Sequence, residues 1–142
     1  AAGMTSTQAQ RNRGEAMPFY QFTVPAGSAT ARKKAEVAAA VTAAHAQITG
    51  APPEYVNCSF TEVPAGSIFA GGRPAAGGRM VGIIRKGRSE EVKRKLMTAL
   101  ADAWVSVTGE PADEIALFVH EVPGYQVMEY GQLLPEASED QQ

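Results

Sequence analysis

The sequence reads TGAP at residues 49–52 and TGEP at residues 108–111, and it reads EVP at both 62–64 and 121–123. Each pair is separated by 59 residues (108 − 49 and 121 − 62). An amphipathic helical pattern precedes each Thr-Gly, and a short apolar run lies between each Thr-Gly and its Glu-Val-Pro. A repeated unit buries its apolar face against its copy. Two copies are too few for a solenoid, so the pattern predicts one domain with internal pseudo-symmetry.

The first copy of the unit predicts a β-α-β arrangement. Residues 19–24 are rich in aromatic and β-branched side chains, which favours a strand. Ser28 or Thr30 can cap a helix over residues 31–48, which Gly50 then ends. Residues 56–63 predict the second strand.

The second copy follows the same plan. Residues 80–84 predict a strand, and Ser89 with two glutamates opens a helix that ends at Gly109. Residues 115–122 predict the closing strand. The inner stripe expected for this helix comprises Val92, Leu96, Leu100, Ala103 and Val107.

Together the two copies predict an α/β fold with a four-stranded sheet and both helices on one face. Connections of this length imply parallel strands joined by right-handed crossovers within each unit. No third helix is predicted to cover the other face of the sheet, so we expect another subunit to cover it. The glycine-rich loop at 65–78 is interpreted as a flexible linker or an active-site flap. It runs into Arg79 rather than Gly-Lys-Ser/Thr, which argues against a phosphate-binding loop.

Composition excludes several classes of function. The net charge of −2 and the pI near 5.7 argue against a nucleic-acid-binding protein. With one cysteine, Cys58, and two histidines that share no ligand spacing, we expect no metal site and no other cofactor. No apolar run approaches the roughly 20 residues of a membrane span. We therefore expect a cytoplasmic protein with no membrane partner.

Three segments are expected along the chain. Residues 1–17 are polar and small, and we interpret them as a flexible N-terminal extension that is either cloning-derived or an alternative start. Residues 18–135 form the folded domain. Residues 136–142 form an acidic tail.

Several short motifs occur in a consistent order across the predicted domain. They are MPFY at 17–20, AAH at 43–45, PAGSIF at 64–69, RKGRS at 85–89 and MEYG at 128–131. In this order and spacing the chain resembles the tautomerase superfamily, and within it the cis-3-chloroacrylic acid dehalogenase branch. The resemblance covers residues 18–135. It implies a cofactor-independent tautomerase that assembles as a homotrimer and acts on small 2-oxo or enol carboxylic acids.

The resemblance also implies the roles of individual residues. Pro18 matches the family's catalytic amine, provided that it is the first residue of the mature chain. Arg85 and Arg88 match the arginines that bind the substrate carboxylate. His45 matches a substrate-binding hydrogen-bond donor, and Glu129 matches the carboxylate that activates water. Without the resemblance, Pro18 would be interpreted as a proline at the start of a strand, and the two arginines as part of a solvent-exposed basic turn. His45 would be interpreted as a histidine at the edge of the core, and Glu129 as a solvent-exposed acid.

The sequence departs from the family pattern at Phe118, a substrate-binding position where the dehalogenase has a tyrosine that helps to position water. Phenylalanine has no hydroxyl, so we expect hydration and dehalogenation of 3-haloacrylates to be weak, while proton transfer survives. Another hydroxyl, for example that of Tyr20, Tyr125 or Tyr130, could compensate.

Two alternatives follow from the position of Pro18. In the 142-residue sequence its nitrogen is an amide without a basic lone pair, whereas a chain that starts at Met17 and loses this methionine exposes a secondary amine. The first alternative predicts a non-catalytic trimeric anion-binding protein. The second, which we favour, predicts the enzyme.

Overall fold

The computed structural model describes residues 17–135, so the expectations for 1–16 and 136–142 lie outside the described residues. The first repeat unit contains two longer strands around a long helix. Its elements are β1 (Phe19–Pro25), α2 (Ala29–Arg32), α3 (Lys34–Thr49), the short 3-10 helix η1 (Pro53–Tyr55) and β2 (Asn57–Val63).

The second repeat unit has the same plan. Its elements are β5 (Arg79–Arg85), α4 (Glu90–Thr108), η2 (Ala112–Glu114) and β6 (Ala116–Val122). Short pieces lie between and after the units: β3 (Phe69–Ala70), β4 (Arg73–Pro74), η3 (Gly124–Gln126), β7 (Met128–Glu129) and β8 (Gln132–Leu133). The predicted β-α-β duplication is confirmed.

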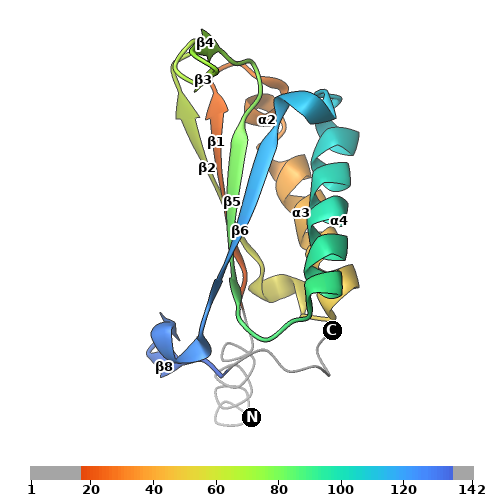
Figure 1. The fold of residues 1–142 in the computed structure, drawn as a ribbon, viewed down its shortest axis with the longest axis vertical. Coiled ribbons are helices and arrows are strands. Elements are labelled where there is room, and N and C mark those ends of the chain that lie inside the picture. The colour runs from red at the N-terminus through yellow and green to blue at the C-terminus, as the bar shows by residue number, and fades with distance from the viewer. Residues whose placement is uncertain (1–16, 136–142) are drawn as a thin grey trace.

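The main sheet has four strands in the order β2-β1-β5-β6. β1 pairs with β2 and β5 pairs with β6 in parallel, as predicted, while β1 and β5 pair antiparallel at the centre. The two long helices, α3 and α4, lie side by side on one face of this sheet (Figure 1). The predicted α/β class and the placement of the helices are therefore confirmed.

The start predicted for the first helix was wrong, because Ser28 caps the short helix α2, whereas α3 starts at Lys34 with no side-chain cap. The start of α4 and the ends of both long helices are as their sequences indicate. The Ser89 side chain accepts a hydrogen bond from the Val92 amide and caps α4. Gly50 and Gly109 adopt left-handed φ values of 77° and 72° and end the two helices. The repeated Thr-Gly is thus a repeated helix C-terminus.

The core between the sheet and the helices is apolar. Its fully buried members are Tyr20, Phe22, Val24, Val37, Val41, Met80, Ile84, Leu96, Leu100 and Trp104. The stripe predicted for α4 omits Trp104, which is fully buried like Leu96 and Leu100, whereas Val92, Ala103 and Val107 are only half-buried. Trp104 continues the spacing of Leu96 and Leu100, and its ring packs edge-on against Phe22 at a centroid distance of 5.1 Å.

A buried polar link joins the two units. The indole nitrogen of Trp104 donates to the Thr30 hydroxyl at 2.8 Å, and this hydroxyl donates to Glu110 Oε1 at 2.7 Å. The Thr30 amide also donates to the same oxygen, at 2.9 Å. The link satisfies polar groups that would be costly to bury alone, and it ties the start of the first unit to the end of α4.

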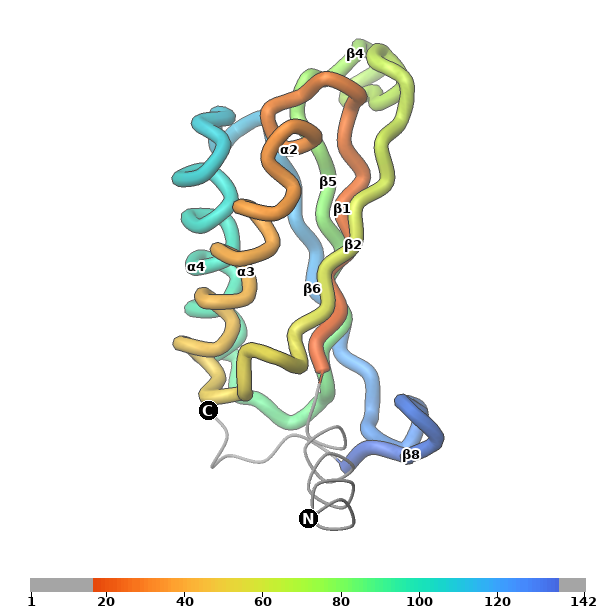
Figure 2. The backbone as a smooth tube through the Cα atoms, turned by 180° about the vertical axis from the view of Figure 1, so that it is seen from behind, coloured from red at the N-terminus to blue at the C-terminus, as the bar shows by residue number. Residues whose placement is uncertain are grey.

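Among residues 17–135, no helix lies on the opposite face of the sheet (Figure 2). The exposed side chains of Phe19, Val81 and Phe118 point away from the helical layer, with exposures of 37%, 36% and 54%. They alternate along their strands with the buried row, as expected for a sheet with one covered face.

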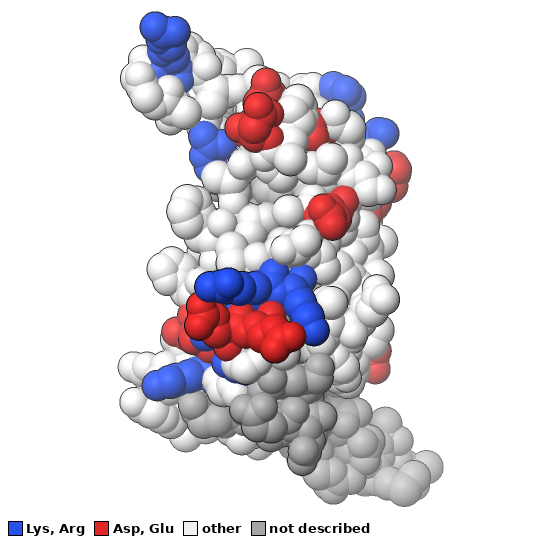
Figure 3. All heavy atoms as spheres, turned by 45° about the vertical axis from the view of Figure 1, so that its right-hand side comes forward, with Lys and Arg blue, Asp and Glu red and all other residues white. Residues whose placement is uncertain are grey.

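The outer face of α4 is charged but balanced. In Figure 3, acidic and basic side chains form a mixed band rather than a patch of one sign. Arg94 pairs with Glu90 at 2.7 Å, and Lys95 pairs with Glu91 at 3.2 Å. These exposed pairs contribute little to stability.

Within residues 17–135, no helix has the length and apolar character needed to cross a membrane. The same part of the chain contains no group of three or more His, Cys, Asp or Glu side chains that could hold a metal ion.

The glycine-rich loop after β2 is folded into the β3–β4 hairpin. It lies at the end of the sheet where β5 starts, opposite the end that Arg85 occupies (Figure 1). Within one chain the loop therefore does not cover the arginines. The loop closes against the second unit through Gly77, where an added Cβ would lie 1.7 Å from the Glu114 carbonyl oxygen.

We predict that Gly77→Ala destabilises the protein by about 3 kcal/mol or more, because the backbone must move to accept the methyl group. The matched control is Gly66→Ala in the same loop, which has open space around it but a φ of +83°. Gly66→Ala should lower the free energy of unfolding by only about 1 kcal/mol. Urea unfolding measures both, and equal losses would contradict the close approach.

Candidate active site

The start of β1 and the end of β5 meet at one end of the sheet. The register pairs Phe19 with Ile83, so its continuation places Pro18 opposite Ile84, next to Arg85. Pro18 is buried, and its carbonyl oxygen accepts a hydrogen bond from the Asn57 amide at 3.1 Å. Met17, which precedes it, is also buried. The antiparallel centre of the sheet thus brings the predicted amine position to the predicted arginines.

Both arginines are buried at this end. Arg85 is the last residue of β5 and is 1% exposed, and Arg88 follows in the loop before α4 at 6% exposed. Arg85 Nη1 donates to the Pro135 carbonyl oxygen at 3.0 Å, so the segment after β8 passes beside it. Burial, and then the nearby positive charge of Arg85, lower the pKa of Arg88 from its ordinary value.

Arg88 also has a free hydrogen-bond donor. Its Nε is buried and has no partner among residues 17–135. A buried cation with an unused donor favours an anion, and a guanidinium group binds a carboxylate through two parallel hydrogen bonds. The end of β5 is therefore suited to a carboxylate ligand.

His45 reaches this cluster from α3. It continues the buried line of Val37 and Val41, as the helical spacing predicts, and its side chain is fully buried. Its Nδ1 lies 2.7 Å from the Tyr20 hydroxyl, and its Nε2 is buried without a partner among the described residues. Burial, assisted by the Arg88 cation, lowers the pKa of His45 to about 3. The imidazole is therefore neutral at ordinary pH.

Glu129 lies in β7, beyond the end of β6. One carboxylate oxygen, Oε1, is buried and has no hydrogen-bond partner within residues 17–135. Burial raises the pKa of Glu129, while the Arg85 cation acts in the opposite direction. The action of the Arg85 cation on this pKa indicates that the carboxylate lies close enough to Arg85 to interact with it.

The structure thus gathers Pro18, His45, Arg85, Arg88 and Glu129 at one end of the sheet. Phe118 does not join them within one chain. It pairs with Val81 in the middle of the sheet and is exposed on the bare face, so it could reach such a cluster only across a subunit contact.

Tyr20 is the residue whose place sequence reasoning missed. It was considered only as a spare hydroxyl, yet its hydroxyl is paired with His45. The signal that could have indicated this role is its position in the inward-facing row of the first strand. The pairing itself depends on how α3 packs against β1, which sequence spacing does not predict.

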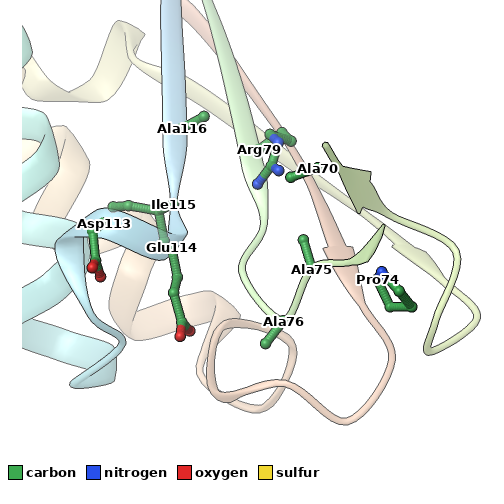
Figure 4. Close-up of a pocket in the computed structure, with 9 residues that line it drawn as sticks. All are labelled: Ala70, Pro74, Ala75, Ala76, Arg79, Asp113, Glu114, Ile115 and Ala116. Carbon is green, nitrogen blue, oxygen red and sulfur yellow. The ribbon is translucent and has the colours of Figure 1, made fainter. Parts of the chain in front are cut away.

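A separate cavity of about 480 Å3 lies at the other end of the sheet. Figure 4 shows that its lining comes from the β3–β5 segment and from the η2–β6 junction. The Arg79 guanidinium in its wall donates to the carbonyl oxygens of Gly77 and Gly78, at 3.3 and 3.0 Å. Because its charge is used to hold the loop, we assign the candidate site to the arginine cluster instead.

Fold and cluster together define a class of small α/β proteins built from two β-α-β units with a buried, cationic site at one end. Residues 17–142 match the family described as "Putative oxalocrotonate tautomerase enzyme", and the chain belongs to this family of the tautomerase superfamily. Members of this superfamily are generally enzymes. A search among curated proteins finds no match.

Solved structures support the same assignment and the predicted branch. The chain is similar to N1, a member of the cis-3-chloroacrylic acid dehalogenase family, with 31% identity and a TM-score of 0.78 over 84% of this chain and 85% of that one. It is similar to a native fused 4-OT, with 32% identity and a TM-score of 0.73 over 81% and 94%. A fused 4-OT described as an asymmetric trimer has 26% identity and a TM-score of 0.73 over the same shares.

We predict that His45 makes the protein sensitive to acid. Between the ordinary histidine pKa of about 6.5 and the folded value of about 3, the unfolded chain binds a proton that the folded chain does not. Stability contributed by the neutral ring is therefore lost as pH falls through this window. As the pH is lowered from about 6.5 towards 3, the free energy of unfolding of the wild type should fall by about 1 kcal/mol per pH unit more than that of His45→Gln.

Urea unfolding at pH 7, 5.5 and 4 measures this difference. His120→Gln, on the exposed face of β6, controls for replacing a histidine elsewhere in the chain. Parallel pH curves for the wild type and His45→Gln would contradict the neutral buried ring.

Proposed function

We propose that this protein is a cofactor-independent tautomerase that interconverts the enol and keto forms of small 2-oxo carboxylic acids. The observation that carries the proposal is the burial of Arg85 and Arg88 beside the start of β1, where Pro18 lies. Membership of a family described as oxalocrotonate tautomerases supports the same chemistry.

The arginines bind the substrate carboxylate in this proposal. Arg88 keeps an unused Nε donor in a buried position, so a carboxylate would satisfy a group that otherwise lacks a partner among the described residues. The same positive charge stabilises the enolate that develops when a proton leaves the substrate. Binding and stabilisation of the intermediate thus come from one pair of side chains.

Pro18 moves the proton. As a first residue it carries a secondary amine, whose ordinary pKa of about 7.7–8 falls when the amine is buried and close to cations. The amine takes the hydroxyl proton of the enol, the O–H electron pair forms the carbonyl, and the shifted double-bond electrons take the same proton at carbon. The reaction is an isomerisation, so it needs no co-reactant.

His45 and Glu129 complete the proposed site. His45 gives the substrate a hydrogen bond, and Glu129 activates water; the effect of the Arg85 cation on the pKa of Glu129 supports its inclusion in the site. Similarity to a member of the cis-3-chloroacrylic acid dehalogenase family favours a secondary hydratase or dehalogenase activity on 3-haloacrylates. We expect this activity to be weak, because Phe118 has no hydroxyl to position the water.

A different class of function applies to a chain in which Pro18 stays internal. Its nitrogen is then an amide and cannot act as a base, while the arginine pair still favours a carboxylate. Such a protein would be a non-catalytic anion-binding trimer. The two possibilities differ in one covalent bond, between Met17 and Pro18.

We predict that a chain beginning at Pro18 converts a 2-hydroxydienoate or an aryl-enolpyruvate to its keto form, and that the full 142-residue chain does not. Arg85→Ala should lower kcat/KM about 100-fold, since it removes charge-assisted hydrogen bonds to the carboxylate. Arg85→Lys keeps the charge and should lose less. Absorbance of the conjugated enol follows the reaction, with cis-3-chloroacrylate assayed in parallel.

Lys86→Ala is the matched control, because Lys86 is the exposed neighbour of Arg85. Equal activity in the two chains would contradict a role for the proline amine. Inactivity in both, combined with carboxylate binding that Arg85→Ala abolishes, would favour the anion-binding protein.

We also propose that the chain forms a homotrimer through the bare face of the sheet. Phe19, Val81 and Phe118 leave apolar surface exposed there, and a second copy of the chain would cover it. A similar structure, the fused 4-OT with 26% identity, is described as a trimer. The same contact would carry Phe118 of one subunit towards the site of another.

We predict that Val81→Asp converts the trimer to 15.0 kDa chains, because it places a charge in the middle of the covered face. Ala39→Asp adds the same charge at an exposed position of α3 and should leave the trimer intact. Light scattering coupled to size-exclusion chromatography measures both masses. A trimer that tolerates Val81→Asp would place the interface elsewhere.

A further inference from the structure

The pair formed by Tyr20 and His45 is fully buried and specific in its geometry. The Tyr20 hydroxyl lies 2.7 Å from His45 Nδ1, and the rings meet edge-on with centroids 5.7 Å apart. Gly82 is the register partner of Tyr20 in β5, and an added Cβ there would lie 2.6 Å from the tyrosine ring. The absence of a side chain at Gly82 thus makes room for this ring position.

Two arrangements of the hydrogens are compatible with this distance, and they differ in cost. If the ring of His45 donated from Nδ1, the Tyr20 hydroxyl hydrogen and the bare Nε2 would both be buried without a partner among the described residues. If Tyr20 donates, the N–H at His45 Nε2 is the one polar group of the pair left without a partner among residues 17–135. Because each buried polar group without a hydrogen-bond partner is destabilising, the second arrangement is favoured.

We infer that Tyr20 is a positioning residue of the proposed active site, which holds His45 in the neutral tautomer with its proton on Nε2. The Nε2–H group then donates a hydrogen bond to the substrate oxygen at which negative charge develops during tautomerisation. This inference rests on the proposed function and adds a residue and a protonation state to it.

The charges around His45 favour the neutral ring. Arg88, from the loop before α4, is the cation that acts on it, and Tyr20 is its partner on β1. Burial acts in the same direction as Arg88, and the pKa of the Tyr20 hydroxyl is raised by its own burial, so the phenol keeps its proton. Both donors in the chain from Tyr20 to His45 to the substrate therefore remain protonated.

A neutral donor fits the proposed reaction. The substrate oxygen carries more negative charge in the enolate than in the keto form, so its hydrogen bond with Nε2–H is strongest near the transition state. Loss of the correct tautomer should therefore lower kcat more than it raises KM. A tyrosine that only filled space would not produce this split.

The direct test is the 15N NMR spectrum of the two histidine rings in the chain that begins at Pro18. The wild-type His45 ring should show an unprotonated Nδ1 and a protonated Nε2, with His120 assigned in the same spectrum. In Tyr20→Phe a measurable fraction of His45 should carry its proton on Nδ1. A protonated Nδ1 in the wild type overturns the inference, and so does an unchanged tautomer in Tyr20→Phe.

The kinetic arm uses the enol substrate of the proposed function. Tyr20→Phe should lower kcat about 10-fold and change KM less than about twofold, as expected for loss of one hydrogen bond near the transition state. Tyr55→Phe, a half-buried tyrosine of η1, is the matched control and should keep full activity. If Tyr20→Phe keeps the kcat of the wild type, Tyr20 is not a positioning residue, even where the NMR spectrum shows the expected tautomer of His45.

The two arms separate this inference from the proposed function. If the wild-type chain that begins at Pro18 has no activity, the tautomerase proposal is contradicted. The NMR spectrum still shows which nitrogen of His45 carries the proton. The wild-type spectrum needs no substitution, so the tautomer assignment is tested even where Tyr20→Phe fails to fold.

Discussion

The antiparallel pairing of β1 with β5 is the contact on which the remaining features depend. It joins the two parallel pairs into one sheet, and its register places the residue before β1 next to Arg85. Because side chains alternate along a strand, a slip of one residue would turn Tyr20 to the bare face and remove it from His45. The centre of the sheet thus determines both the core and the candidate site.

The candidate site is a continuation of the core rather than a separate hollow on the surface. Along the inner row of β1, Val24 and Phe22 are followed by Tyr20, and along α3 the buried valines are followed by His45. Polar groups therefore enter at one end of an otherwise apolar layer. In such surroundings a charged side chain loses its hydration, so burial is the largest cause of the shifted pKa values of His45, Arg88 and Glu129.

Periodicity and the duplicated Thr-Gly predicted the four long strands, the two long helices and their shared face, because these depend on local pattern. Trp104 was left out of the predicted stripe, although it continues the four-residue spacing of Leu96 and Leu100 and is buried with them. The Tyr20–His45 pair joins residues 25 positions apart and depends on tertiary packing. In the structure the arginines, His45 and Glu129 lie at one end of the sheet, and their roles in a site remain predictions. The place of Phe118 in a site depends on neighbouring subunits that one chain does not contain.

The duplication leaves the two copies chemically unequal. By the correspondence of β1 with β5, the position equivalent to Pro18 is Gly78, which lies inside the chain, and an added Cβ there would lie 2.7 Å from Val24 Cγ1. A polypeptide has only one amino terminus, so fusing two units leaves the second without a free amine at this place. In the proposed tautomerase only the first unit can therefore supply an amine, while the corresponding place in the second unit is occupied by the close approach of Gly78 to β1.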